Sequence, residues 1–288
     1  MLKSIHTPIA CTRLSLVVNV VLFALKLFAG IYGRSQALVA DALNSLLDIV
    51  ANIIVWFGLR IARKPPDREH PYGHGNADTI AAVLVALILV VTGGYIGRES
   101  LDSIINHNFR TPTYLATAAA LFTIIVKGIL YKYTVNIGRR FRSQAVMANA
   151  QDHKADVVVS AGTLVGIILA QIEYPILDPI AGLWVAFFIL KQAVAILKEN
   201  FSTLMVSSPD IARQENIKKF ISDLDNVVAA KWVKGRQVGT DYYLDSAVMV
   251  RGDISVREGH EIAHSIRSAV IDNFPEVADI LVHIEPDE

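Results

Sequence analysis

Apolar residues form six long runs before residue 200. A helix rising 1.5 Å per residue needs about 20 such residues to cross about 30 Å of hydrocarbon, and each run is close to that length or longer. The sequence therefore predicts six membrane-spanning helices. The first run is too long for a cleaved signal peptide and lacks a small-residue cleavage pattern, so we expect it to remain a helix. The predicted spans are residues 12–32, 36–61, 79–105, 112–137, 144–171 and 177–198.

The pattern changes near residue 208, where apolar runs shorten and charged residues become frequent. We therefore expect a membrane domain over residues 1–205 and a cytoplasmic α+β domain over residues 206–288. Helical and alternating apolar spacings predict the order α-β-β-α-β, of the ferredoxin-like kind, with Gly235 and Gly239 marking the hairpin. The predicted elements are residues 211–224, 227–233, 242–250, 255–274 and 279–285.

Composition supports a membrane protein. The 288 residues are 53% hydrophobic and 19% charged, against about 25% charged in an ordinary soluble domain. The single cysteine, Cys11, excludes an internal disulfide and a CxxC metal knuckle, so metal ligands must be oxygen and imidazole groups. The 27 basic and 27 acidic residues leave no basic surplus of the kind that nucleic-acid binding needs. Residues 1–200 carry 18 basic and 12 acidic residues, however, and the tail carries 9 and 15, so the tail attracts cations.

Basic residues in the short loops predict the orientation of the spans, because cytoplasmic loops are enriched in Lys and Arg. The second and fourth loops carry Arg63, Lys64 and Arg68, then Arg139, Arg140 and Arg142, whereas the opposite loops carry only Arg34, Arg98 and Arg110. Both termini are therefore expected in the cytoplasm, in what we interpret as a bacterial inner membrane. Asp178 and Pro179 are expected to start the last span as its N-cap and first helical residue.

Polar residues inside two spans form the main candidate site. Asp41, Asn44 and Asp48 share one face of the second span, and Asp152 and Asp156 share one face of the fifth. Charges at membrane depth are costly and are usually functional. The structural alternative is that these carboxylates bond to hydroxyls or to a lysine such as Lys127. We assign no functional role to Lys26, Lys127 or Lys191. Two oxygen ligands from each helix are better interpreted as a four-ligand cation site.

The ordered motifs resemble the cation diffusion facilitator family of dimeric, proton-coupled divalent-metal exporters. They are the segment Ser35 to Asp41, the segment His70-Pro71-Tyr72-Gly73-His74-Gly75, the segment Asp152 to Asp156, and the tail. The resemblance covers essentially the whole chain. It implies a homodimer in a lipid bilayer and a transport site of Asn44, Asp48, Asp152 and Asp156, with Asp41 and His153 as further candidates.

The quartet departs from the zinc-selective pattern of that family, in which a histidine holds one of the four positions. All-oxygen sites suit harder ions, so Mn²⁺ or Fe²⁺ is favoured as substrate. Zn²⁺ stays an alternative, because affinity order favours zinc and because His153, about 100° around the helix, could rotate in. The residue at position 76 is asparagine where the family's dimer contact near the membrane exit uses a lysine.

Two further clusters lie outside the spans. In the loop before the third span, Asp67, His70 and His74 have the spacing of a three-ligand set, although a solvated loop with incidental histidines is the alternative. The resemblance implies an accessory cation site at these positions.

In the tail, His283 and Glu285 point to one face of a strand, and His260 and His264 share one face of a helix. With Asp245, the residues His260, His283 and Glu285 are expected to hold one regulatory ion, with His264 in reserve. The family's binuclear zinc centre uses histidines where this chain has Lys231 and Ala247. A surface with ordinary charges is the alternative.

The sequence therefore predicts proton-coupled efflux of a divalent metal rather than an enzyme activity. A membrane metalloenzyme would need an HExxH helix or a dense set of histidine boxes, which the chain lacks. A membrane metal sensor that does not transport is the alternative from another class, although the tail is small and acidic for a signalling domain. Metal ions serve as substrate and as regulatory ligand, and protons serve as the counter-ion.

Overall fold

The computed structural model describes residues 7–141, 143–205, 208, 210–239 and 241–287. Its elements are α1 Pro8–Tyr32, α2 Gln36–Ala62, α3 Ala77–Ile105, α4 Tyr114–Phe141, α5 Gln144–Ile172, α6 Leu177–Leu204, α7 Ile211–Ser222, β1 Ala229–Val238, β2 Asp241–Val250, α8 Val256–Asn273 and β3 Val277–Pro286. Within the described residues, α1 to α6 are the six helices long and apolar enough to cross a membrane. The prediction of six spans followed by α-β-β-α-β is confirmed.

The chain forms two compact units, and helices α2, α3 and α6 each contribute residues to both. Unit 1 comprises Met1–Ile54 and Leu84–Ile196, and unit 2 comprises Val55–Val83 and Leu197–Glu288. The predicted domain boundary between residues 205 and 206 adjoins residues 206 and 207, which lie outside the described residues, and it stays a prediction.

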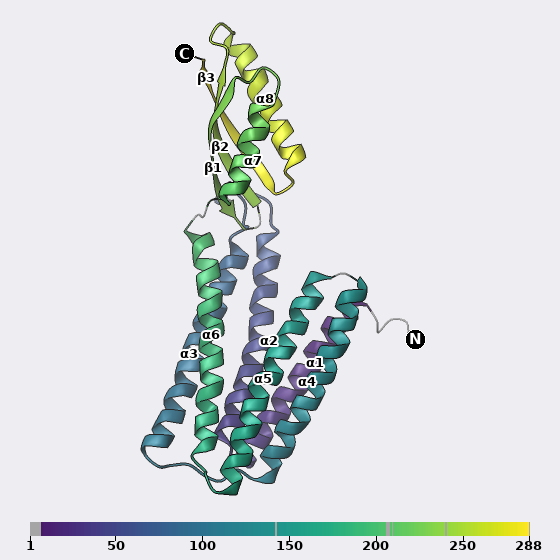
Figure 1. The fold of residues 1–288 in the computed structure, drawn as a ribbon, viewed down its shortest axis with the longest axis vertical. Helices are drawn as coiled ribbons and strands as arrows, with labels where there is room; N and C mark the ends of the chain where they lie inside the picture. Colours follow the sequence, from purple (N-terminus) through teal and green to yellow (C-terminus); the bar gives the residue numbers. More distant parts are fainter. Residues whose placement is uncertain (1–6, 142, 206–207, 209, 240, 288) are drawn as a thin grey trace. The chain divides into compact units, whose positions relative to one another are not determined.

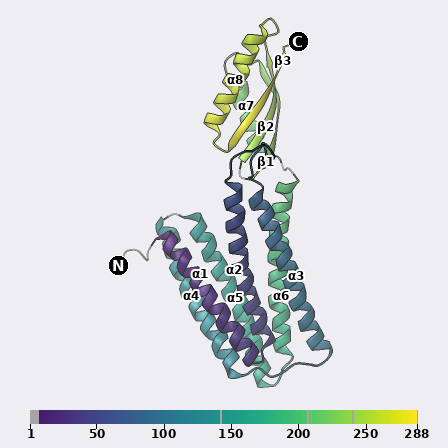
Figure 2. The ribbon, with the colours of Figure 1, turned by 180° about the vertical axis from the view of Figure 1, so that it is seen from behind.

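In unit 1, helices α1, α4 and α5 lie side by side, and α3 lies beside α6 (Figures 1 and 2). Leu47, Leu89 and Ile189 join α2, α3 and α6 in one buried cluster, which Val159 of α5 also enters. Large apolar side chains such as Val91 point outward and are exposed. This outward apolar surface is what a bundle needs to contact lipid, since its backbone groups are satisfied within the helices.

The start of α6 differs from the prediction. The helix begins at Leu177, one residue before Asp178. The Asp178 carboxylate accepts hydrogen bonds from the Ser35 hydroxyl and from the Gln36 backbone N–H, each at 2.6 Å. Asp178 therefore caps the beginning of α2 rather than α6, because a carboxylate can satisfy the unpaired N–H groups of a neighbouring helix as well as those of its own.

In unit 2, the sheet has the order β1-β2-β3, with β1 antiparallel and β3 parallel to β2. A parallel pair needs a crossover, and α8 supplies it. Helices α7 and α8 cover one face of the sheet (Figure 1). Ile217 of α7, Val248 of β2 and Ile266 of α8 meet in the buried core between them.

Strand β1 extends further than predicted. β1 continues to Val238, so Gly235 lies within the strand opposite Leu244, and only Gly239 belongs to the turn. Gly239 has φ +62°, a conformation that favours glycine, and its N–H donates to Asn76 Oδ1 at 2.9 Å. A Cβ atom at this position would lie 2.7 Å from the Gly75 carbonyl oxygen. The hairpin therefore fits closely against the loop between α2 and α3.

We predict that Gly239→Ala lowers the free energy of unfolding of unit 2 by roughly 1–2 kcal/mol, because the left-handed conformation is unfavourable for an L-residue and the added Cβ collides with Gly75. Urea unfolding of the solubilised chain, followed by circular dichroism, measures this. Gly252→Ala is the matched control, since its nearest neighbours lie at 3.4 Å. Equal destabilisation by both substitutions would contradict the explanation.

Candidate metal sites

The four predicted transport ligands lie on α2 and α5 within unit 1. Asn44 is buried, Asp48 and Asp156 are partly buried, and Asp152 is exposed. Asp48 of α2 interacts electrostatically with Asp156 and Asp152 of α5. Their carboxylate oxygens do not converge: in the described part of the chain, only the loop cluster brings three histidine or carboxylate ligand atoms within 4.8 Å.

Asp156 is held by a lysine from another helix. Lys127 of α4 is fully buried, and its ammonium donates to Asp156 Oδ2 at 2.5 Å and to Asn19 Oδ1 of α1 at 2.7 Å. The sequence interpretation left Lys127 without a role and mentioned it only as a possible structural partner. The sequence feature that predicts this ion pair is a lysine in the middle of an apolar span, because such a charge requires a buried partner.

Asp41 belongs to a second ion pair. Lys26 of α1 donates to Asp41 Oδ1 at 3.0 Å, to the Asp41 carbonyl oxygen at 2.9 Å and to Ser45 at 2.6 Å. The other carboxylate oxygen of Asp41 accepts from Ser160 at 2.8 Å. Both oxygens are therefore engaged within the protein, which is the structural arrangement that the sequence left open for these carboxylates.

His153 faces α1 and not Asp156. Its ring is buried, and Nε2 lies 3.1 Å from the Ser15 hydroxyl. Asn149, one turn earlier on α5, donates to the same hydroxyl at 3.3 Å. As a metal ligand, His153 would have to give up the contact with Ser15.

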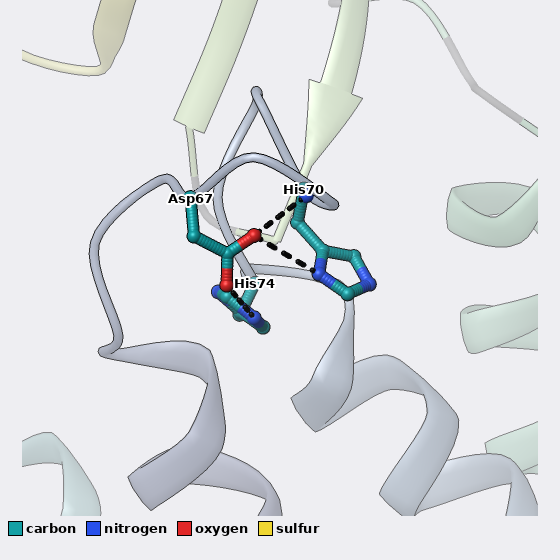
Figure 3. Close-up of side chains that lie close together, drawn as sticks. All are labelled: Asp67, His70 and His74. Carbon is teal, nitrogen blue, oxygen red and sulfur yellow. Dashed lines mark hydrogen bonds and ion pairs between the residues drawn. The ribbon is translucent and has the colours of Figure 1, made fainter.

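Asp67, His70 and His74 come together as predicted (Figure 3). The Asp67 carboxylate lies 3.4 Å from His70 Nδ1 and 3.4 Å from His74 Nε2. The two imidazole rings are 4.5 Å apart between centroids. His74 Nδ1 is buried without a hydrogen-bond partner among the described residues. One carboxylate and two imidazoles at this spacing are a ligand set suited to Zn²⁺ and similar ions.

Backbone N–H groups of the loop donate hydrogen bonds to the Asp67 carboxylate. The His70 N–H donates to Asp67 Oδ1 at 2.7 Å and the Glu69 N–H at 3.0 Å. The His70 hydrogen bond, together with that of Glu69 and the adjacent imidazoles, lowers the pKa of the Asp67 carboxyl below its usual range. Asp67 therefore remains ionised, as a metal ligand must be.

The five predicted metal ligands of the tail lie in two different layers, the sheet and helix α8. Val282 and Ile284 pack into the core under α8, so His283 and Glu285, which alternate with them, point to the open face of the sheet. His260 and His264 are exposed on α8, which covers the other face, and their ring centroids are 4.8 Å apart. A single chain therefore does not bring the predicted set of Asp245, His260, His283 and Glu285 together.

Glu285 already has a cationic partner. Its carboxylate accepts from the Lys231 ammonium, and His283 Nε2 lies 3.9 Å away. The Lys231 hydrogen bond lowers the pKa of the Glu285 carboxyl below its usual range. Lys231 is one of the two positions at which the resemblance implies a histidine ligand, and here its ammonium pairs with Glu285.

Comparison with known proteins settles the family. The cation efflux transmembrane domain matches residues 12–205, and the cytoplasmic domain of cation efflux proteins matches residues 209–287. The chain is a cation diffusion facilitator. As a member of this family it is an integral membrane protein that exports metal cations.

Curated relatives of this cation diffusion facilitator include manganese exporters. The manganese efflux system protein MneP of Bacillus subtilis is 35% identical over 280 residues, covering 95% of this chain and 94% of the relative. MneS of the same organism is 34% identical, covering 94% and 93%. The magnetosome protein MamB of Magnetospirillum gryphiswaldense is 30% identical, covering 91% and 89%. The solved structure of MamM CTD H264E is 23% identical, with a TM-score of 0.26, and covers 27% of this chain and 94% of that chain.

We predict that Asp67→Asn weakens divalent-metal binding at the loop by about tenfold or more, since it removes the anionic ligand while Asn retains an acceptor for the loop N–H groups. Isothermal titration in an Asp156→Ala background, which disables the expected membrane site, measures it. Glu69→Gln removes the same charge next to the cluster without removing a member of it. Similar losses in both variants would indicate general attraction of cations rather than a site.

Proposed function

We propose that this cation diffusion facilitator exports a divalent metal from the cytoplasm in exchange for protons, with Mn²⁺ or Fe²⁺ as its substrate. The observation that carries the proposal is that α2 and α5, joined by the hydrogen bond from Ser160 to Asp41, each carry two oxygen ligands in the membrane unit. Asn44 and Asp48 are the proposed ligands from α2, and Asp152 and Asp156 are those from α5.

Exchange with protons follows from the chemistry of the ligands. A divalent ion binds carboxylates only in their ionised form, so metal and protons exclude each other at the same oxygens. If α2 and α5 expose the quartet first to one side of the membrane and then to the other, protons entering from outside release the metal there. The proton gradient then drives the metal outward.

The choice of metal rests on two independent observations. Oxygen ligands favour harder ions, and imidazole is absent from the four positions. Two relatives with more than 90% mutual coverage are manganese efflux system proteins. Together they favour Mn²⁺, with Fe²⁺ next; Zn²⁺ is the alternative substrate.

We propose that the protein works as a homodimer in the bacterial inner membrane with both termini in the cytoplasm. Residues 1–205 then carry transport, and residues 206–288 carry dimerisation and metal-dependent regulation. Because His260 and the open-face residues Asp245, His283 and Glu285 lie on different layers of one chain, a regulatory ion in the tail would draw ligands from both subunits. The loop triad is a separate accessory site.

Purified protein in liposomes with an imposed pH gradient tests the transport proposal. We expect Mn²⁺ to accumulate against the direction of proton flow, and we expect uptake to stop when an ionophore collapses the gradient. Asp156→Ala should abolish transport. His283→Ala should retain it, because that side chain lies on a sheet outside the six spans. Failure to move Mn²⁺, Fe²⁺ or Zn²⁺ would overturn the proposal and favour a metal sensor; equal loss in both variants would overturn the division of roles.

We predict that Asp152→His changes the ratio of Zn²⁺ to Mn²⁺ transport by about tenfold toward Zn²⁺, since imidazole suits zinc better than a carboxylate does. Competition between the two ions for uptake into liposomes measures the ratio. Asp152→Asn is the control, because it removes the same charge but keeps an oxygen ligand. A similar shift in both variants would show that charge, rather than imidazole, determines the preference.

A further inference from the structure

Lys127 occupies an unusual position for a lysine in a membrane helix. It lies near the middle of α4, about 20 Å from either end at 1.5 Å per residue, and its side chain is fully buried. Lysines near helix ends extend their ammonium groups to the membrane surface, but at this depth the surface is out of reach. The charge therefore depends on partners within the bundle.

Those partners come from three other helices. Asn19 of α1 and Asp156 of α5 accept hydrogen bonds from the ammonium at 2.7 Å and 2.5 Å. Asp48 of α2 and Asp152 of α5 interact with it electrostatically. The ammonium thus lies within electrostatic reach of all three carboxylates of the proposed transport site and forms its direct ion pair with Asp156.

Lys26 provides the internal comparison. It is equally buried, and its ion pair with Asp41 is reinforced by Ser45 and by the Asp41 carbonyl oxygen, while Ser160 satisfies the remaining carboxylate oxygen. The Lys26 ammonium also interacts electrostatically with Asp48, but none of the groups that it hydrogen-bonds belongs to the quartet. The Lys26 pair is therefore a structural link, whereas the Lys127 pair uses an oxygen that the metal also needs.

We propose that Lys127 is the internal counter-cation of the transport site: its ammonium binds Asp156 when the site is empty, and the arriving metal ion displaces it toward Asn19. The inference rests on the proposed transport function. A fixed positive charge beside the bound ion weakens metal binding and favours release, because like charges repel strongly where water is scarce. Lys127 is accordingly a positioning residue that sets affinity and turnover rather than a metal ligand.

The substitution Lys127→Met keeps the length of the side chain and removes its charge. We expect the Kd for Mn²⁺, measured by titration of the solubilised protein at one fixed pH, and the KM for uptake into liposomes to fall by about tenfold or more. The maximal rate should also fall, because release becomes slow. Lys127→Arg, which keeps the charge, should restore values close to those of the original protein.

Lys26→Met is the matched control, since it removes a buried ammonium of the other ion pair. It should lower thermal stability and change the KM for Mn²⁺ much less than Lys127→Met does, because the Lys26 ammonium hydrogen-bonds no member of the quartet. If Lys127→Met instead lowers stability with an unchanged or raised Kd, the ion pair is structural and the inference is wrong. If the original protein transports no metal while Lys127→Met tightens binding as expected, transport fails and the counter-cation assignment stands.

Asn19→Ala gives a second test that does not depend on the folding of Lys127→Met. It removes the acceptor that receives the displaced ammonium, so the ammonium is held by Asp156 alone. We expect the Kd for Mn²⁺ to rise severalfold, opposite in direction to Lys127→Met. A fall or no change would contradict displacement toward Asn19.

Discussion

Pairing of charges inside an apolar bundle is the constraint on which the membrane unit depends. An ion removed from water is tolerated only when a partner and further hydrogen bonds compensate its lost hydration. Lys26 with Asp41 links α1 to α2, and Lys127 with Asp156 links α4 to α5. Helix α5 takes part in both networks, because Ser160, one turn after Asp156, bonds to Asp41. The rotation of α5 that satisfies these partners also determines where Asp152 and Asp156 point.

Patterns within short stretches of sequence predicted the membrane spans and the loop cluster, but not the contacts between helices. Hydropathy and length identified the six spans, since any helix in lipid must satisfy both. The loop triad was predictable because Asp67, His70 and His74 lie within eight residues and meet through one turn of the chain. Helical spacing likewise placed Asp152 and Asp156 on one face. It offered Lys127 only as one possible partner for the carboxylates of both helices and did not pair it with Asp156, because that contact joins two helices and their mutual rotation is fixed by packing.

In the tail, the alternation of residues in the last strand already separates two groups of the predicted ligands. Alternation placed His283 and Glu285 on one face, and the apolar residues between and beside them, Val282 and Ile284, already marked the opposite face as the one that helices cover. That reasoning excludes a one-chain site with His260. The ion pair between Lys231 and Glu285 was less accessible, since it joins β1 to β3 and depends on the order of the strands.

Charge balance explains why a lysine belongs beside a quartet of this composition. A ligand set with two carboxylates, one imidazole and one neutral amide matches a divalent ion in charge. In the proposed quartet, Asp152 stands where an imidazole would give that balance, so three ionised carboxylates would exceed the charge of the ion by one. The Lys127 ammonium, within electrostatic reach of all three carboxylates, offsets that excess. In our proposal the same charge serves two states: it neutralises part of the empty site, where unpaired carboxylates are unfavourable, and it limits how tightly the ion is held. An exporter needs both, because a site that binds its substrate too strongly cannot release it.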